Sequence, residues 1–240
     1  MSFLERIEEQ PGAAELRAAS YRLLALKRGA TCVDVGCGAG HAAAELARKG
    51  LKVTGIDADP EAVEAARSRA PGAMFHVAHS DELPIEDESM DGYRAMRLFH
   101  LLDDPAPTVA EARRVLRPGG RIVVGGQDYG FLMLDGTDQD LTDVVLLGLE
   151  SRTAAPRAAR GLRALLIDKG FREVEVAVHT DVVTDHRQMA PQLAAAAAAA
   201  VEKALITQAD ADSWLADQAR RGRRDRFLAA IPTILVAANA

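Results

Sequence analysis

The chain has 240 residues, of which 48% are hydrophobic, and its formal net charge is -6 at pH 7. A chain of this length and composition can bury a sizeable core as one domain without disulfides or metal ions to hold it together. The acidic balance argues against nucleic acid as a partner, because neutralising phosphates requires concentrated Lys and Arg. No signal-peptide pattern and no apolar run of about 18 residues is evident, which argues against a membrane partner. We expect a cytoplasmic protein, and its oligomeric state, monomer or homodimer, stays open.

The two cysteines, Cys32 and Cys37, lie close together, and no cluster of Cys and His has the spacing of metal ligands. We expect both to be buried thiols in a reducing compartment and expect no metal site.

The first predicted elements are helical. Apolar residues recur at helical spacing through residues 3–27, and Pro11-Gly12 interrupts them. This pattern predicts two short helices ahead of the main domain.

A glycine-rich segment follows at residues 33–40, Val-Asp-Val-Gly-Cys-Gly-Ala-Gly. Residues 31–35 are predicted to form a buried strand, and residues 42–49 a helix that Gly50 closes. Glycines in a turn from strand to helix let a ligand approach bare backbone. The segment therefore indicates a ligand-binding turn, with a purely structural glycine turn as the alternative.

The spacing of the glycines excludes two common ligand classes. A dinucleotide fingerprint would need glycine at position 41, where this chain has His41. A phosphate-binding loop would need Lys-Ser or Lys-Thr after the glycines, and neither pair occurs. What remains is an acidic residue followed by glycine at alternate positions.

A second candidate position is Asp57, at the end of the next predicted strand, residues 52–56. It lies about 20 residues after the glycine turn, the spacing at which such folds offer a carboxylate to ribose hydroxyls. Asp59 and Pro60 are predicted to begin the following helix, as N-cap and first helical residue. Asp57 is thus expected at the tip of its strand, with a solvated loop acid as the alternative.

From these motifs onward the chain resembles the class I S-adenosylmethionine-dependent methyltransferases, in the group that acts on small molecules and quinones. The resemblance covers residues 30–126. It rests on the glycine motif and Asp57 and on four further segments, which read Ser-Asp-Glu-Leu-Pro-Ile at 80–85, Ser-Met-Asp at 89–91, Leu-Phe-His-Leu at 98–101 with Asp-Pro at 104–105, and Arg-Val-Leu-Arg-Pro-Gly-Gly-Arg-Ile-Val-Val at 114–124. The last segment predicts a helix over 108–116, a Pro-Gly-Gly turn and a strand over 121–125.

The resemblance implies an α/β fold, a Rossmann-like seven-stranded mostly parallel sheet with helices on both faces. It also implies N-terminal helices, a helical insertion between the last two strands, and S-adenosylmethionine as the cofactor, with S-adenosylhomocysteine as its product. The implied cofactor-binding residues are Asp34, Gly36, Cys37, Gly38, Gly40, Asp57, Ala58, His79, Ser80, Asp81 and Arg97. His79 departs from the family, which usually has Asp there facing the adenine amino group; Ser80 or Asp81 are alternatives for that contact.

The C-terminal half is expected to carry the substrate side. Its predicted helices span 141–150 and 157–169, its predicted strands span 172–178 and 231–237, and the insertion between these strands contains predicted helices at 193–206 and 210–221. The insertion includes seven consecutive alanines, which favour a smooth helix that packs closely on a neighbour. Five arginines around Gly222 are expected to form a solvated helix end, with an anionic substrate contact as the alternative.

We expect one methyltransferase domain over residues 1–240. It comprises an N-terminal helical lid at 1–29, the cofactor-binding core at 30–126 and a substrate-side half at 127–240 with a helical cap at about 187–224. Tyr21 is either a lid residue near the methyl group or a packing residue, and Tyr129 is a second candidate for substrate contact.

The expected chemistry is transfer of an electrophilic methyl group to O, C or N of a small organic molecule, in secondary metabolism. Candidate catalytic bases lie at predicted strand tips, and they are His100 and Asp128, followed by His179 and His186. His100 could instead pack beside the site, and Asp128 could bind a substrate hydroxyl or cap a turn. Two alternatives to methyl transfer are a cyclase that retains the methyl group and a binding module without catalysis.

Overall fold

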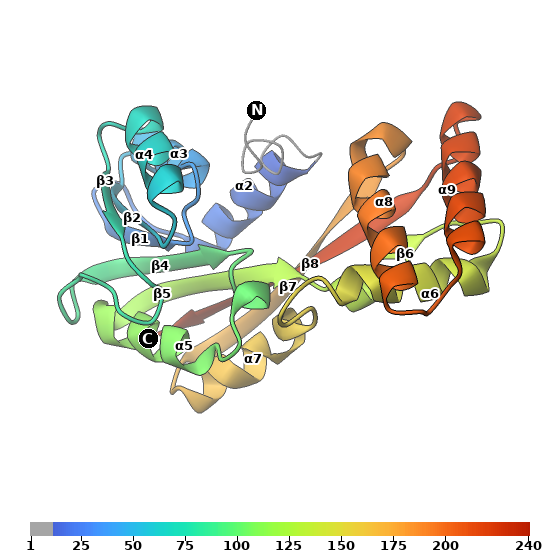
Figure 1. Ribbon diagram of the computed structural model, residues 1–240. Coiled ribbons are helices and arrows are strands. Elements are labelled where there is room, and N and C mark those ends of the chain that lie inside the picture. Colours follow the sequence, from blue (N-terminus) through green and yellow to red (C-terminus); the bar gives the residue numbers. More distant parts are fainter. Residues whose placement is uncertain (1–11) are drawn as a thin grey trace.

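A central β-sheet organises the computed structural model, which describes residues 12–240 (Figure 1). In this part of the chain the strands are β1 (Thr31–Val35), β2 (Lys52–Asp57), β3 (Met74–Val77), β4 (Met90–Met96), β5 (Leu116–Gln127), β6 (Met133–Leu134), β7 (Arg172–Val183) and β8 (Ala229–Asn239). The helices are α2 (Ala13–Leu24), α3 (His41–Arg48), α4 (Pro60–Arg69), α5 (Ala106–Val115), α6 (Gln139–Glu150), α7 (Ala158–Asp168), α8 (His186–Glu202) and α9 (Gln208–Arg223), with 3-10 turns η1 (Phe99–Leu101) and η2 (Tyr129–Phe131).

The sheet combines five parallel strands with an antiparallel pair. Strands run in the order β3-β2-β1-β4-β5-β8, and β7 lies on the other edge of β8. The short strand β6 pairs with Ala229 and Ala230 of β8, beyond the point where β5 ends opposite Thr233. The predicted Rossmann-like, mostly parallel sheet of seven strands is confirmed, and the two-residue β6 is an eighth strand that the sequence pattern did not indicate.

Helices cover both faces of this sheet, as predicted (Figure 1). On one face, α2, α3 and α4 bury Leu16, Leu46 and Val63 against Val123 and Leu235 of the sheet. On the other face, α5 and α7 pack on strand residues that alternate with these, including Ile122 and Val124. Neighbouring strand residues point to opposite faces, so the apolar residues of β1 and β5 contribute alternately to the two cores.

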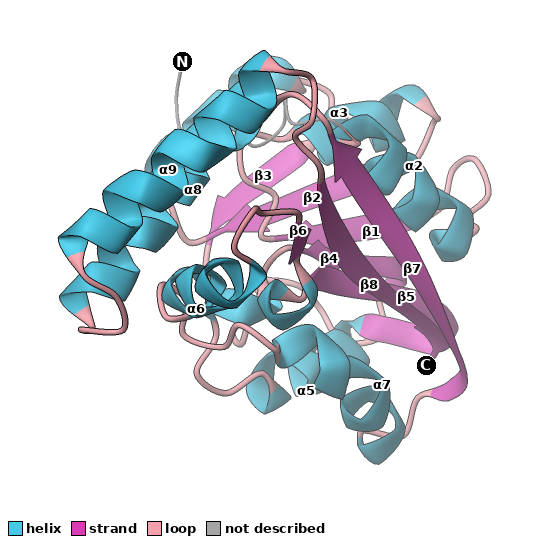
Figure 2. Cartoon of the chain, turned by 90° about the vertical axis from the view of Figure 1, so that its right-hand side faces the viewer, coloured by secondary structure: helices cyan, strands magenta, loops and turns pink. Residues whose placement is uncertain are grey.

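The remaining helices, α6, α8 and α9, form a layer beyond the carboxyl ends of β4 and β5, which we call the helical cap (Figures 1 and 2). Its core contains Val145, Leu193 and Trp214. A side chain at Gly148 of α6 would lie 2.3 Å from the carbonyl oxygen of Ala196 in α8. The alanine run therefore packs backbone to backbone against α6, as its composition predicted.

Several elements extend beyond their predicted limits. β7 continues to Val183, and β8 already starts at Ala229. Both strands are longer than predicted because their hydrogen bonds to each other continue past the end of β5 into the cap. α8 begins seven residues earlier than predicted, where Asp185 accepts a hydrogen bond from the Arg187 amide, and it contains Pro191. The first of the two predicted N-terminal helices lies largely outside the described residues, and α2 matches the second.

Gly40 provides a test of how the glycine turn packs. Its φ is +78°, and a Cβ would lie 2.8 Å from the Cβ of Ala66 in α4. We expect Gly40→Ala to cost about 1–2 kcal/mol of unfolding free energy for the left-handed backbone and about 1–3 kcal/mol for overpacking. Gly170→Ala is the matched control, since its φ is +83° and no atom lies within 4 Å of the added Cβ. Urea unfolding of both variants gives the comparison, and equal losses would contradict a close contact with α4.

Candidate functional site

The glycine turn lies between β1 and α3, and backbone hydrogen bonds hold it in place. Gly36, Gly38 and Gly40 have φ values of +69°, +51° and +78°, which residues other than glycine rarely adopt. The Cys37 amide donates to the Ile56 carbonyl at 2.9 Å, and the Gly40 amide donates to the Cys37 carbonyl at 3.0 Å. Gly36 and Gly38 remain partly exposed, whereas Gly40 is buried under α4. The accessible side of the turn is therefore its first half.

Asp57 stands directly beside this turn, as its spacing predicted. One carboxylate oxygen accepts from the Gly38 amide at 2.7 Å, and the other accepts from the Asp59 amide at 3.0 Å. Each oxygen of a carboxylate can accept a second hydrogen bond. The structure thus brings the two motifs together and leaves Asp57 able to bind donors, with Ala58 exposed next to it.

Asp34 takes a different position from the one expected. Its side chain is fully buried, and it pairs with Arg94 of β4 at 2.6 Å across neighbouring strands. The same guanidinium donates to the Ser20 hydroxyl of α2 at 3.0 Å. Asp34 therefore supports the turn from within the core, as the partner of Arg94. Sequence reasoning missed Arg94, although an arginine between Tyr93 and Ala95 in a predicted central strand was a signal for a buried partner.

The candidate adenine loop follows β3. The Ala78 amide donates to the Asp57 carbonyl at 3.1 Å, which brings this loop next to Asp57. His79 and Asp81 are exposed, and the Ser80 hydroxyl is 2.8 Å from the hydroxyl of Thr108 in α5. The two exposed side chains can reach a ligand, whereas Ser80 ties the loop to the helix.

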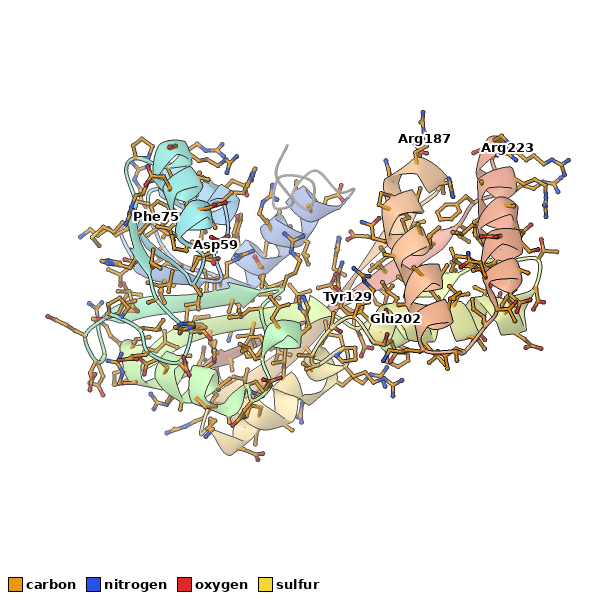
Figure 3. The ribbon with its side chains drawn as sticks, viewed as in Figure 1. Asp59, Phe75, Tyr129, Arg187, Glu202 and Arg223 are labelled. Carbon is orange, nitrogen blue, oxygen red and sulfur yellow. The ribbon has the colours of Figure 1, made fainter. Side chains whose placement is uncertain are left out.

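Arg97, His100 and Tyr129 meet where β4 and β5 end. The Arg97 amide donates to the Gly125 carbonyl at 2.8 Å, with a left-handed φ of +59°. The rings of His100 and Tyr129 pack edge to face with centroids 5.7 Å apart. Figure 3 shows Tyr129 between the sheet and the helical cap. Burial, and then the Arg97 charge, lower the pKa of His100, so the imidazole is neutral at pH 7.

The prediction of Asp128 as a candidate catalytic base is corrected here, because the structure gives this side chain a structural role. It is fully buried, and the Arg160 guanidinium of α7 donates to both of its oxygens, one at 2.9 Å. One oxygen also accepts from the Gly130 amide and caps η2. Both oxygens of this carboxylate are thus occupied by protein donors, and turn capping was one of the alternatives the sequence left open.

Tyr21 is a packing residue in this structure. Its hydroxyl donates to Glu45 of α3 at 2.8 Å, and the Arg17 guanidinium donates to the same carboxylate. The Arg94 guanidinium lies 5.7 Å from the Tyr21 ring centroid. Burial raises the pKa of the Tyr21 hydroxyl, so it stays protonated. Tyr21 thus joins α2 to α3, and a lid role is not supported.

Both cysteines are free and buried, as predicted, and burial raises the pKa of each thiol. Within residues 12–240, no group of three or more His, Cys, Asp or Glu side chains could hold a metal ion. In the same residues, no helix is both long and apolar enough to span a bilayer.

Two hollows of about 680 and 190 Å³ lie around the end of α9, and no residue of the glycine turn lines either. In Figure 3, Arg187 and Arg223 project from the ends of α8 and α9. Arg220 and Arg221 pair with Asp217 and Asp135, which favours the interpretation of the arginine cluster as a helix end.

Comparison with known proteins matches residues 33–124 to a family described as a methyltransferase domain. Over 77% of its length the chain is 32% identical to an uncharacterized 37.1 kDa protein in transposon TN4556 of Streptomyces fradiae, covering 56% of that protein. It is 37% identical over 43% of its length to 27-O-demethylrifamycin SV methyltransferase of Amycolatopsis mediterranei, covering 40% of that enzyme. The chain thus spans about half the length of these relatives.

A solved structure shows the same fold. The YcgJ protein of Bacillus subtilis superposes with a TM-score of 0.66 at 16% identity, over 94% of this chain and 98% of that one.

The buried Asp34–Arg94 pair should dominate the stability of the region below the turn. Arg94→Met leaves an uncompensated buried carboxylate, so we expect a loss of about 3–5 kcal/mol in urea unfolding. Asp34→Asn combined with Arg94→Met should recover part of that loss. Arg187→Ala, which removes an exposed partner of Asp185, is the control and should leave the midpoint nearly unchanged. A loss below about 1 kcal/mol for Arg94→Met would show that the pair is not buried in solution.

His100 should make stability depend on pH. Its pKa is below 6.5 in the folded protein and about 6.5 when unfolded, so between these values the unfolded chain binds more protons. The contribution of His100 to the free energy of unfolding is therefore constant above pH 6.5 and falls as the pH drops from 6.5 toward the folded pKa. We expect His100→Gln to lose less unfolding free energy than the wild type between pH 7.5 and 5.5. His76→Gln, at an exposed histidine of β3, is the control and should follow the wild type.

Proposed function

We propose that this protein is a class I S-adenosylmethionine-dependent methyltransferase that transfers a methyl group to a small organic molecule, which the match of residues 33–124 to a methyltransferase-domain family supports. The observation that carries the proposal is the contact between the Asp57 carboxylate and the Gly38 amide, which joins the two parts of the proposed nucleoside-binding site. The rifamycin methyltransferase relative supports a small-molecule acceptor in secondary metabolism.

The residues present fit this cofactor. The partly exposed half of the turn, at Gly36 and Gly38, lets a ligand come close to the backbone, since no Cβ stands in the way. The carboxylate of Asp57 can accept from ribose hydroxyls while it keeps its two backbone bonds. His79 and Asp81 are exposed beside it for the adenine end, and Arg97 offers a cation for a carboxylate.

The cofactor supplies an electrophilic methyl group when bound, so the task of the protein is to orient the acceptor and exclude water. The glycine turn and Asp57 hold one partner at the carboxyl ends of β1 and β2. The helical cap lies beyond the carboxyl ends of β4 and β5, where the rings of His100 and Tyr129 pack together, and this is where the acceptor would bind. Open α/β sheets bind ligands at this edge. We also propose a cytoplasmic location, which the two free thiols support.

Calorimetry with S-adenosylmethionine and S-adenosylhomocysteine tests the cofactor site. We expect both to bind the wild-type protein and expect Asp57→Ala to weaken binding by about tenfold or more, equivalent to about 1.4 kcal/mol. Asp210→Ala is the control, because that exposed carboxylate only closes the first turn of α9. Absence of binding to the wild type would refute the proposed function.

A further inference from the structure

Three polar side chains form a row across the last three strands of the sheet. Thr233 of β8 lies opposite Gln127, the last residue of β5, and opposite His179 of β7. Residues directly opposite in antiparallel strands point to the same face. The row therefore lies on one face, the one that α2 covers, at the level where β5 ends.

His179 in this row has an orienting partner. Its Nε2 is 2.9 Å from Oδ1 of Asp181, two residues further along β7 and on the same face. The His179 side chain is 24% exposed and that of Asp181 is 11% exposed. A Cβ at Gly12 would overlap Asp181, so α2 starts directly above this carboxylate. The pair is thus sheltered and fixed, and the His179 ring is still accessible.

The row also contains an unpartnered polar atom. The Thr233 hydroxyl is fully buried and has no hydrogen-bond partner among residues 12–240. A buried hydroxyl without a partner destabilises a fold, and such groups are retained where a ligand uses them. If packing were the only role of position 233, the protein would be more stable with valine there than with threonine.

We propose that Gln127, Thr233 and His179, with Asp181 as the positioning residue, form a subsite for a hydroxyl-bearing methyl acceptor, with His179 as the catalytic base. The inference rests on the proposed function. It narrows the methyl-accepting atom from O, C or N to the oxygen of a phenol or an alcohol. The hydroxyl group of such an acceptor must lose its proton during the transfer. An amine, in contrast, can attack through its lone pair while it keeps its protons.

The proton balance follows from the histidine geometry. A carboxylate only accepts, so Nε2 of His179 carries the proton that Asp181 binds, and the lone pair is on Nδ1. The acceptor O–H proton moves to Nδ1 as the oxygen forms its bond to the methyl carbon and the carbon–sulfur bond breaks. The products are a methyl ether, S-adenosylhomocysteine and an imidazolium that Asp181 stabilises.

The charges around the pair are of both signs. Glu15 of α2 and Arg97 after β4 act electrostatically on Asp181, and Arg97 also acts on His100 and Tyr129. Arg97 therefore lies within electrostatic reach of both the β7 pair and the ring pair. Arg97, the residue proposed for the carboxylate of the cofactor, thus acts electrostatically on the proposed subsite. The other candidate, His186, packs edge to face on Phe227 in the cap.

Methyl transfer to a panel of phenols, catechols and aliphatic alcohols, with the matched aromatic amines, tests the subsite. The assay follows isotope-labelled methyl from S-adenosylmethionine and the mass of each product. We expect transfer to hydroxyl compounds and expect His179→Gln to lower kcat about 100-fold. Affinity for S-adenosylhomocysteine should change less than about twofold, and His186→Gln, the matched control, should behave as wild type. Transfer to amines alone, no transfer to any hydroxyl compound, or wild-type kcat in His179→Gln overturns the proposal.

Two readouts are independent of turnover. Nitrogen NMR of labelled histidine should show the proton of neutral His179 on Nε2, and Asp181→Asn should reduce that preference. Thr233→Val should keep or raise the urea midpoint and raise the acceptor KM about tenfold. A proton on Nδ1, or a lowered midpoint in Thr233→Val, contradicts the subsite. Failure of the proposed function itself is distinguishable, because S-adenosylhomocysteine would then not bind at all.

Discussion

The ion pair between Asp34 and Arg94 is the interaction on which the region around the glycine turn depends. Both side chains are buried, and they join β1 to β4 while Arg94 also holds α2 through Ser20. A buried charge without its partner is costly, so β1, β4 and α2 have one favourable arrangement. The turn that follows β1 and the segment that follows β4, which contains Arg97 and His100, are positioned by the same contact.

The edge formed by the strand ends gathers the proposed functional groups. Parallel strands end at a common edge, so the turn after β1, Asp57 after β2 and Arg97 after β4 meet there although they are distant in sequence. The hydrogen bond from Gly38 to Asp57 then makes the turn and the carboxylate one unit. Fixed backbone of this kind places a ligand without reorganising, which favours orientation of the reacting atoms.

The β7–β8 ribbon links this edge to the helical cap. Its strands pair beyond the end of β5 and carry His179 and Asp181 from the sheet toward α8. The cap is packed through small residues, with Gly148 against the alanine run, and its hollows lie away from the glycine turn. The ribbon is therefore the element that brings the C-terminal half of the chain to the proposed site.

The sequence by itself determined the order of strands and helices, the glycine turn and the position of Asp57, because these follow from local patterns of apolar residues, glycines and caps. It also predicted His100 as a candidate base and Tyr129 as a candidate substrate contact, and the rings of these two residues pack together in the structure. Only the tertiary structure decided what Asp34, Asp128 and Tyr21 contact, since Arg94, Arg160 and Glu45 reach them from distant segments. It likewise decided that His179, Thr233 and Gln127 share a row. Hydrogen-bond register between strands far apart in the chain sets such contacts, and no local pattern encodes it.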